Sequence, residues 1–147
     1  MKKDIIKQLL LQKNPSEVWD YLTIPELLAE WLMSNDFKLA VGHKFQFQSK
    51  AGKDCETEGV AYCEVLQIIP LKFLSYSWRA KGADGIITVD SVVSWTLSEK
   101  NGGTELLFQH KGFSLEEDYQ SHSKGWDNCV ERLTQIVNQK DHARSNA

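Results

Sequence analysis

The sequence lacks the features that mark secreted, membrane-spanning and nucleic-acid-binding proteins. Its three cysteines form no Cys-x-x-Cys pair, so neither a disulfide framework nor a zinc site of the usual spacing is expected. No run of 18 apolar residues is present, and the basic N-terminus is followed by Asp4 rather than by an apolar secretory segment. The net charge is −3 and no basic stretch is dense. We therefore expect a cytoplasmic protein with no membrane span and no nucleic-acid partner.

Motifs of cofactor-dependent and nucleophilic catalysis are also missing. The sequence contains no phosphate-binding glycine loop, dinucleotide fingerprint or nucleophile elbow. Gly102-Gly103 reads as part of a turn. Glu56, Glu58 and Glu64 have even spacing, which places them together on a solvated strand face. We expect no cofactor, no metal and no residue that the sequence alone marks as catalytic.

Aromatic residues are abundant. The chain has five Trp, four Tyr and six Phe among 147 residues. Each such side chain buries on the order of 150–250 Å², so they supply either a large core or an aromatic-lined site. The length predicts one domain, which we assign to residues 1–139, followed by a disordered tail over 140–147.

The order of the patterns is strand, two short helices, several strands and one long helix. A short apolar run from Ile5 to Gln12 is followed by two helix-start signals, at Asn14-Pro15 and at Pro25-Glu26. Period-two alternation then predicts an antiparallel sheet with one buried face. Its expected inward positions include Phe45, Phe47, Leu74, Tyr76, Trp78, Val89, Ser91, Val93, Trp95, Leu97, Leu106, Phe108 and His110.

The last pattern is a helix that begins after Ser114, with acids in its first turn. An apolar stripe with spacings of three and four follows, made of Tyr119, His122, Trp126, Cys129, Leu133 and Ile136. A helix and a sheet that each have one apolar face cover each other. The predicted class is therefore α+β, with a curved antiparallel sheet of about six or seven strands wrapped around a long C-terminal helix.

Several short pieces of the sequence resemble one family. They are Pro15, Glu17, Val18 and Trp19; Pro25, Glu26 and Trp31; Val41-Gly42; Gly59-Val60; Pro70 with Leu74, Tyr76 and Trp78; Gly103-Thr104-Glu105-Leu106; and Gly125-Trp126 before Leu133. In this order, from about Lys3 to Val137, they resemble the START/Bet v-like (SRPBCC) helix-grip superfamily. Within this superfamily, the sequence resembles most the branch related to the C-terminal domain of the activator of the heat-shock-protein-ninety ATPase. The chain departs from the family at Gly42-His43, often Gly-Gly, and at Ile69, often an acid.

The resemblance implies a deep cavity between the curved sheet and the long helix. Gly125 fits this, because a missing side chain beside Trp126 leaves space between helix and sheet. The alternative is that Gly125 admits a closely packed sheet residue.

The candidate ligand-binding residues are those that would line such a cavity: Trp31, Phe47, Tyr62, Tyr76, Trp78, Phe108, His110, His122 and Trp126. The aromatic members alternatively form an ordinary core. The two histidines would orient a ligand carboxyl group or act as acid and base near neutral pH; alternatively, backbone groups satisfy them or they lie at the rim of the cavity.

Three functions are compatible with this pattern. The first is a non-enzymatic protein that binds a small hydrophobic or aromatic molecule. The second is a stress-related or co-chaperone-like protein-interaction domain, as monomer or dimer. The third is a cyclase-like or aromatase-like enzyme that uses His110, His122 and Tyr76. We rank them in this order, because the aromatic residues and the cavity that the resemblance implies favour the first. The fold alone does not fix the function, because one fold hosts many functions.

Overall fold

The computed structural model describes residues 3–48, 60–81 and 85–145, with side chains placed as far as residue 138. Cys55, Glu56, Glu58 and Gly59 lie outside these residues. The elements follow the predicted order and are β1 (Lys3–Leu11), α1 (Pro15–Thr23), α2 (Pro25–Trp31), β2 (Ser34–Asn35), β3 (Lys44–Gln48), β4 (Val60–Ile69), β5 (Phe73–Lys81), β6 (Ile87–Lys100), β7 (Gly103–Phe113) and α3 (Glu116–Ser145).

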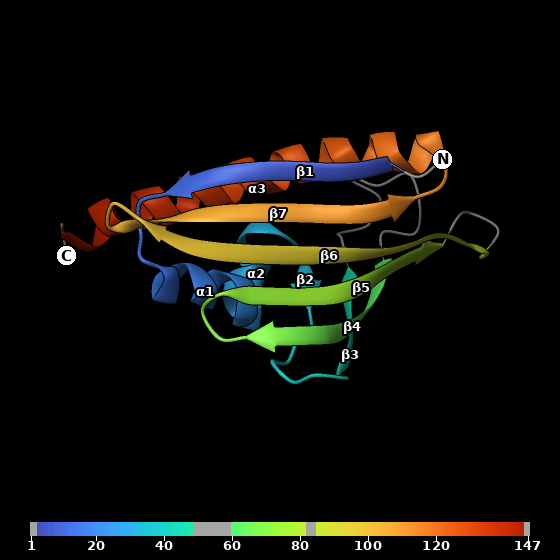
Figure 1. Cartoon of the computed structure of the whole chain (residues 1–147), viewed down its shortest axis with the longest axis horizontal. Helices are drawn as coiled ribbons and strands as arrows, with labels where there is room; N and C mark the ends of the chain where they lie inside the picture. The colour runs from blue at the N-terminus through green and yellow to red at the C-terminus, as the bar shows by residue number, and fades with distance from the viewer. Residues whose placement is uncertain (1–2, 49–59, 82–84, 146–147) are drawn as a thin grey trace.

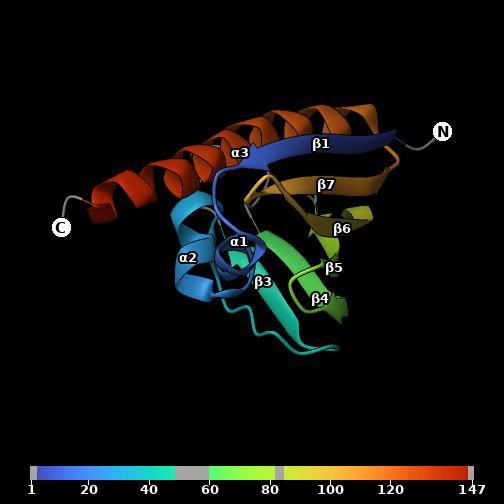
Figure 2. The same ribbon diagram turned by 60° about the vertical axis from the view of Figure 1, so that its left-hand side comes forward.

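All seven strands belong to one antiparallel sheet. Their spatial order is β1-β7-β6-β5-β4-β3-β2, so the first strand pairs with the last and every other neighbour follows in sequence. Figure 1 shows α3 running along β1 and β7, and Figure 2 shows the sheet curving away beneath it toward β3. The predicted α+β helix-grip fold is confirmed. The two-residue β2 was not predicted, because two residues carry no readable alternation.

The two short helices are confirmed, and their start signals act differently. At α1 the Asn14 side chain accepts a hydrogen bond from the Glu17 backbone N–H at 3.0 Å, and Pro15 occupies the first turn. At α2 the capping residue is Ile24, whose side chain makes no capping hydrogen bond. Pro25, whose fixed φ suits the first helical position, and the acid Glu26 in the first turn mark that start.

Burial follows the predicted alternation on the central strands. On β6, the side chains of Val89, Ser91, Val93, Trp95 and Leu97 are all buried. On β7, those of Leu106, Phe108 and His110 have no exposed surface. The period of two therefore identified the concave, core-facing side of the sheet correctly.

The buried stripe of α3 differs slightly from the predicted one. Trp126 and Leu133 are buried as expected, but Val130 and Val137 are buried in place of Cys129 and Ile136, which lie at the edge. At about 100° per residue, Val137 lies closer than Ile136 to the direction set by Trp126 and Leu133, whereas Val130 and Cys129 lie equally far from it on opposite sides. The helix runs on to Ser145 through most of the range predicted as a disordered tail. The division at residue 139 stays a prediction.

Polar contacts fix α3 along one edge of the sheet. Lys7 of β1 forms an ion pair with Asp127, and the Asn138 side chain accepts from the Gln12 backbone N–H at 2.9 Å. In the C-terminal half of α3, Arg132 donates a hydrogen bond to the Trp31 carbonyl at 3.2 Å, which connects α3 to α2. Among the described helices, none has the length and apolar composition needed to cross a membrane.

Gly103, at the start of β7, lies very close to the backbone of β1. A Cβ built on Gly103 would collide with the Leu11 backbone carbonyl oxygen, which cannot move without shifting β1. We expect Gly103→Ala to lower the free energy of unfolding by about 1–3 kcal/mol, as overpacking does. Urea denaturation checks this. Gly125→Ala is the matched control, because its Cβ meets nothing within 4 Å, and it should not destabilise. Equal stability of the two variants would contradict the close approach.

Candidate functional site

Eight of the nine predicted site residues lie in the layer between the concave sheet face and the helices. They come from α2, β3, β5, β7 and α3, and seven of them have 3% or less of their surface exposed, while His122 is half-buried. The set is Trp31, Phe47, Tyr76, Trp78, Phe108, His110, His122 and Trp126. We call these eight residues, together with Trp95, the aromatic cluster.

Tyr62 is the exception, and its predicted place inside is wrong. On β4, Ala61 and Cys63 point to the core, so Tyr62 between them points to the opposite, convex face. There the Lys81 ammonium group lies 4.8 Å from the centre of its ring. The alternation of β4 places it outward, and aromatic character alone had suggested otherwise.

The rings of the aromatic cluster touch one another in a continuous network centred on Trp126. Its ring centre lies 4.4 Å from that of Phe108, 5.4 Å from Trp78 and 5.9 Å from Trp95. The ring of Phe47 in turn stacks on that of Trp78 at 5.4 Å. These are the usual separations of packed aromatic pairs. A ligand that entered here would have to displace rings or occupy the border of the cluster.

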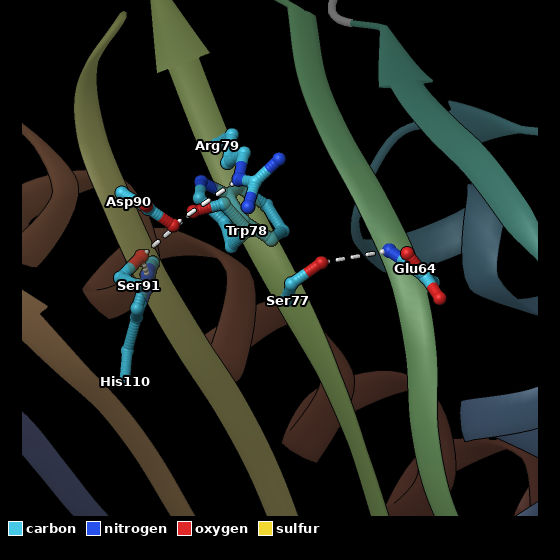
Figure 3. Close-up of polar contacts among 7 residues, drawn as sticks. All are labelled: Glu64, Ser77, Trp78, Arg79, Asp90, Ser91 and His110. Atoms are coloured by element: carbon cyan, nitrogen blue, oxygen red, sulfur yellow. Dashed lines mark hydrogen bonds and ion pairs between the residues drawn. The ribbon is translucent and has the colours of Figure 1, made fainter. Parts of the chain in front are cut away.

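His110 joins α3 to the sheet through hydrogen bonds on both ring nitrogens. The Trp126 indole N–H donates to Nδ1 at 2.9 Å, which requires a lone pair there. The proton of the neutral ring therefore sits on Nε2, which donates to the Ser91 hydroxyl at 2.7 Å. That hydroxyl donates in turn to the Trp78 carbonyl at 2.9 Å. Figure 3 shows Ser91 between His110 and the Trp78 backbone.

The environment keeps His110 neutral. Its side chain has no exposed surface, and burial lowers its pKa well below the ordinary value, with His122 nearby adding to the effect. Protonation would also remove the acceptor that Trp126 uses. His110 is thus a fully bonded core histidine, with neither nitrogen available to a ligand.

His122 is also bonded on both sides, but less deeply. Its Nδ1 donates to the Asp118 carbonyl at 2.9 Å, and its Nε2 accepts from the Trp78 indole N–H at 3.3 Å. Burial lowers its pKa, and the Asp118 backbone and charge partly oppose that shift. The Trp78 bond is the longer of the two. His122 is therefore the less tightly held of the two histidines.

Asp118 carries the one polar side-chain atom in the described residues that is buried without a hydrogen-bond partner. This atom is Oδ2 of its carboxylate, in the first turn of α3 and one turn before His122. A buried polar atom without a partner is unusual and calls for a physical explanation.

Tyr76 and Cys63 are two further buried titratable groups, and the interior favours the neutral form of each. The Tyr76 hydroxyl accepts from the Trp95 indole at 3.0 Å, and complete burial raises its pKa well above the ordinary range. Burial likewise raises the pKa of the Cys63 thiol, so a reactive thiolate is disfavoured. In the described part of the chain, no group of three or more His, Cys, Asp or Glu residues could hold a metal ion.

Two pockets of the described residues lie away from the layer between the sheet and α3. One, of about 290 Å³, lies where the β6–β7 turn meets the end of β1. The other, of about 320 Å³, lies on the convex side around Tyr62, Lys44 and Arg79. Arg79 there forms an ion pair with Asp90 at 3.1 Å (Figure 3). The predicted cavity stays a prediction.

Gly125 has open space beside it. A Cβ added there meets nothing within 4 Å, so the alternative of a closely packed sheet residue against this position is wrong. Asp127, two residues on, pairs with Lys7 of β1. Positions two apart on a helix differ by about 200°, so Gly125 lies on the flank of α3 that faces away from β1.

Four residues of the site, Ser91, Trp95, Phe113 and Asp118, carry no motif that marks them as functional in the sequence. The first two were predicted inward positions on β6, so their place was readable but their hydrogen bonds were not. Phe113 packs on His110 with ring centres 4.5 Å apart and on His122 at 5.0 Å. No signal in the sequence marked Asp118, which looked like one of three acids at a helix start.

The Ser91 hydroxyl should be needed for stability. Ser91→Ala leaves the His110 Nε2–H and the Trp78 carbonyl without their described partner, so we expect the free energy of unfolding to fall by about 1–3 kcal/mol. Ser94→Ala is the matched control, since this half-buried serine lies on the opposite face of the same strand and should change stability by about 0.5 kcal/mol or less. Urea denaturation measures both. Equal stability of the two variants would contradict a stabilising role for the hydrogen bonds of the Ser91 hydroxyl.

Comparison with known proteins agrees with this geometry. The sequence from residue 12 to residue 138 matches the family described as Activator of Hsp90 ATPase homolog 1-like protein. A comparison with curated proteins finds no match. Among solved structures, the chain is similar to protein MLL2253 from Mesorhizobium loti, with 34% identity, a TM-score of 0.81, and coverage of 93% of this chain and 98% of that one.

Two more distant structures show the same fold. The Aha1 dimer from Colwellia psychrerythraea is 17% identical, with a TM-score of 0.74 and coverage of 92% of this chain and 96% of that one. DynU16, a putative protein in the dynemicin biosynthetic locus, is 19% identical, with a TM-score of 0.75 and coverage of 91% of this chain but 46% of that one. With its family match spanning most of its length and its sheet wrapped around α3, the chain belongs to the Activator of Hsp90 ATPase homolog 1-like family of the helix-grip superfamily.

Proposed function

We propose that this protein binds a small apolar or aromatic molecule between the concave face of the sheet and α3, without catalysing a reaction. The observation that supports this most is the aromatic cluster itself. It is continuous, it spans the layer from α2 to α3, and its indole and imidazole nitrogens are bonded to other protein groups. What it offers to a ligand is therefore mainly ring surface, which suits an apolar partner.

The flank of α3 at Gly125 is the place where such a ligand would enter the layer. Space is available there, and the adjacent Trp126 is the centre of the cluster. A mid-helix glycine costs about 1 kcal/mol relative to alanine. Binding at this flank would explain why the helix keeps a glycine at that cost.

Catalysis receives less support from the same geometry. His110 has both nitrogens engaged in the core, and His122 shares its two between Trp78 and the Asp118 backbone. The Tyr76 hydroxyl is buried against Trp95. An acid or base must reach the proton that it transfers, and here each candidate is occupied by another protein group.

The protein-interaction alternative rests on the family description and on the dimeric state of one neighbour. A contiguous exposed apolar patch would favour it. Exposed large apolar side chains include Leu10 on β1, Val41 before β3 and Ile86 before β6. Exposed apolar residues are ordinary on a protein surface, so we favour the ligand, which has the continuous aromatic cluster as its support. The biosynthetic locus named for DynU16 is in keeping with a small-molecule role for the fold.

Native mass spectrometry of protein purified from its own kind of cell tests the proposal directly. We expect a reproducible excess mass that disappears when the protein is unfolded in a denatured control. A bare mass in every preparation, together with no binding of an apolar fluorescent probe such as anilinonaphthalene sulfonate to the native protein, would argue against the proposal.

Two substitutions at Gly125 distinguish the effect of filling the space beside Trp126 from the effect of replacing a mid-helix glycine. Gly125→Ala and Gly125→Leu both remove the glycine cost, so each should raise the free energy of unfolding by up to about 1 kcal/mol. Only the leucine side chain is long enough to fill the space beside Trp126. We expect the alanine variant to retain the excess mass and the leucine variant to lose it. Equal retention by both variants would show that this flank is not the binding site.

A further inference from the structure

We propose that His122, Trp78 and Asp118 form an acid-sensitive switch at the N-terminal end of α3. In the neutral state, His122 holds the Trp78 indole. In the protonated state, His122 turns to the Asp118 carboxylate and releases Trp78, which loosens this end of the aromatic cluster. This proposal does not depend on the identity of a ligand or on the existence of one.

The neutral state is the one that the structure shows. Nε2 of His122 accepts from the Trp78 indole, so it must carry a lone pair, while Nδ1–H donates to the Asp118 carbonyl. An imidazolium ring has two N–H groups and no lone pair. Protonation therefore turns the Nε2–indole hydrogen bond into a contact between two donors, and that contact cannot persist.

The protonated state has an acceptor ready on the same helix face. Oδ2 of Asp118 is buried and has no partner among the described residues. It belongs to the residue four positions before His122, a spacing at which helical side chains meet. The Asp118 charge favours the protonated ring, opposing the burial that disfavours it. The unpartnered oxygen is thus explained as the second position of the switch.

Few other charges act on His122. From β5 it faces Trp78, which does not titrate, and from β7 it faces Phe113 and His110. From its own helix it faces Asp118. His110 lies 5.7 Å away between ring centres and is completely buried, so it resists protonation more strongly. Of these two histidines, His122 is therefore the one that takes up a proton first as the pH falls.

The direction of the pH dependence follows from burial. The pKa of His122 is lowered from its ordinary value of 6.5. His122 therefore takes up a proton less readily while it holds the Trp78 indole than after that hydrogen bond has opened. The arrangement is fully stable above pH 6.5 and loses stability as the pH falls below that value toward the lowered pKa. One linked proton changes the opening equilibrium by up to about tenfold for each pH unit in this window.

Release of Trp78 would affect the cluster, because its ring stacks on Phe47 and touches Trp126. Its backbone remains fixed by the Ser91 hydroxyl and by the pairing of β5 with β6. Movement is thus confined to the indole, and the sheet is retained. The switch is local and does not require unfolding.

Hydrogen exchange of the indole N–H groups, followed by NMR on the whole chain from pH 7 to pH 5, tests the proposal. The Trp95 indole is an internal control, because it donates to the Tyr76 hydroxyl, which does not titrate in this range. We expect protection of the Trp78 indole, relative to that of Trp95, to fall by up to about tenfold per pH unit below 6.5. A constant ratio would overturn the proposal, as would a simultaneous loss of protection at every tryptophan.

Three variants test whether His122 and Asp118 cause the pH dependence of the Trp78 indole protection. His122→Gln provides an amide oxygen near the Nε2 position that accepts from Trp78 and does not titrate, so the pH dependence of the ratio should vanish. Asp118→Asn removes the charged acceptor of the protonated state, so the transition should move to lower pH. His43→Gln alters an exposed hydrogen bond to the Asp36 carbonyl, and should leave the ratio unchanged. Persistence of the pH dependence in the His122→Gln protein, or an unmoved transition in the Asp118→Asn protein, would refute the assignment.

Discussion

The hydrogen bond from the Trp126 indole to the His110 imidazole is the contact on which the interior depends. It bonds α3 to β7, and it is completely buried. Because it requires a lone pair on Nδ1, it fixes the tautomer of His110 and the direction of the bonds that follow through Ser91 to the Trp78 backbone. A buried network of this kind is stabilising only while every member is satisfied.

This constraint determines what the interior can do chemically. Polar groups that would serve as an acid, a base or a ligand anchor are used to hold aromatic rings in place. The Trp31 indole donates to the Tyr21 carbonyl, and the Trp95 indole donates to Tyr76. The surface that remains is mostly ring faces and edges, so recognition here depends on shape and apolar contact. The internal hydrogen bonds thus favour binding of an apolar molecule and disfavour catalysis for the same reason.

The sequence could predict positions better than partners. Alternation placed Ser91, Trp95 and His110 on the inner face correctly, because a period of two depends only on the backbone. It could not predict that Ser91 meets His110, since their pairing depends on the register between β6 and β7 and on rotamers. Tyr62 was misplaced when aromatic character was given more weight than alternation. Asp118 could not be predicted at all, because its unpartnered oxygen exists only once α3 is packed.

The two ends of the aromatic cluster are held in different ways, and this asymmetry decides where the interior can yield. Beside α1 and α2, Trp31 is fixed by a 2.9 Å bond from its indole and by Arg132 at its carbonyl, and both bonds are accepted by backbone carbonyl groups. At the N-terminal end of α3, Trp78 is held by a 3.3 Å bond to a half-buried imidazole. A local opening that retains the sheet therefore begins at Trp78, whose partner His122 lies about one helical turn before Gly125 on α3.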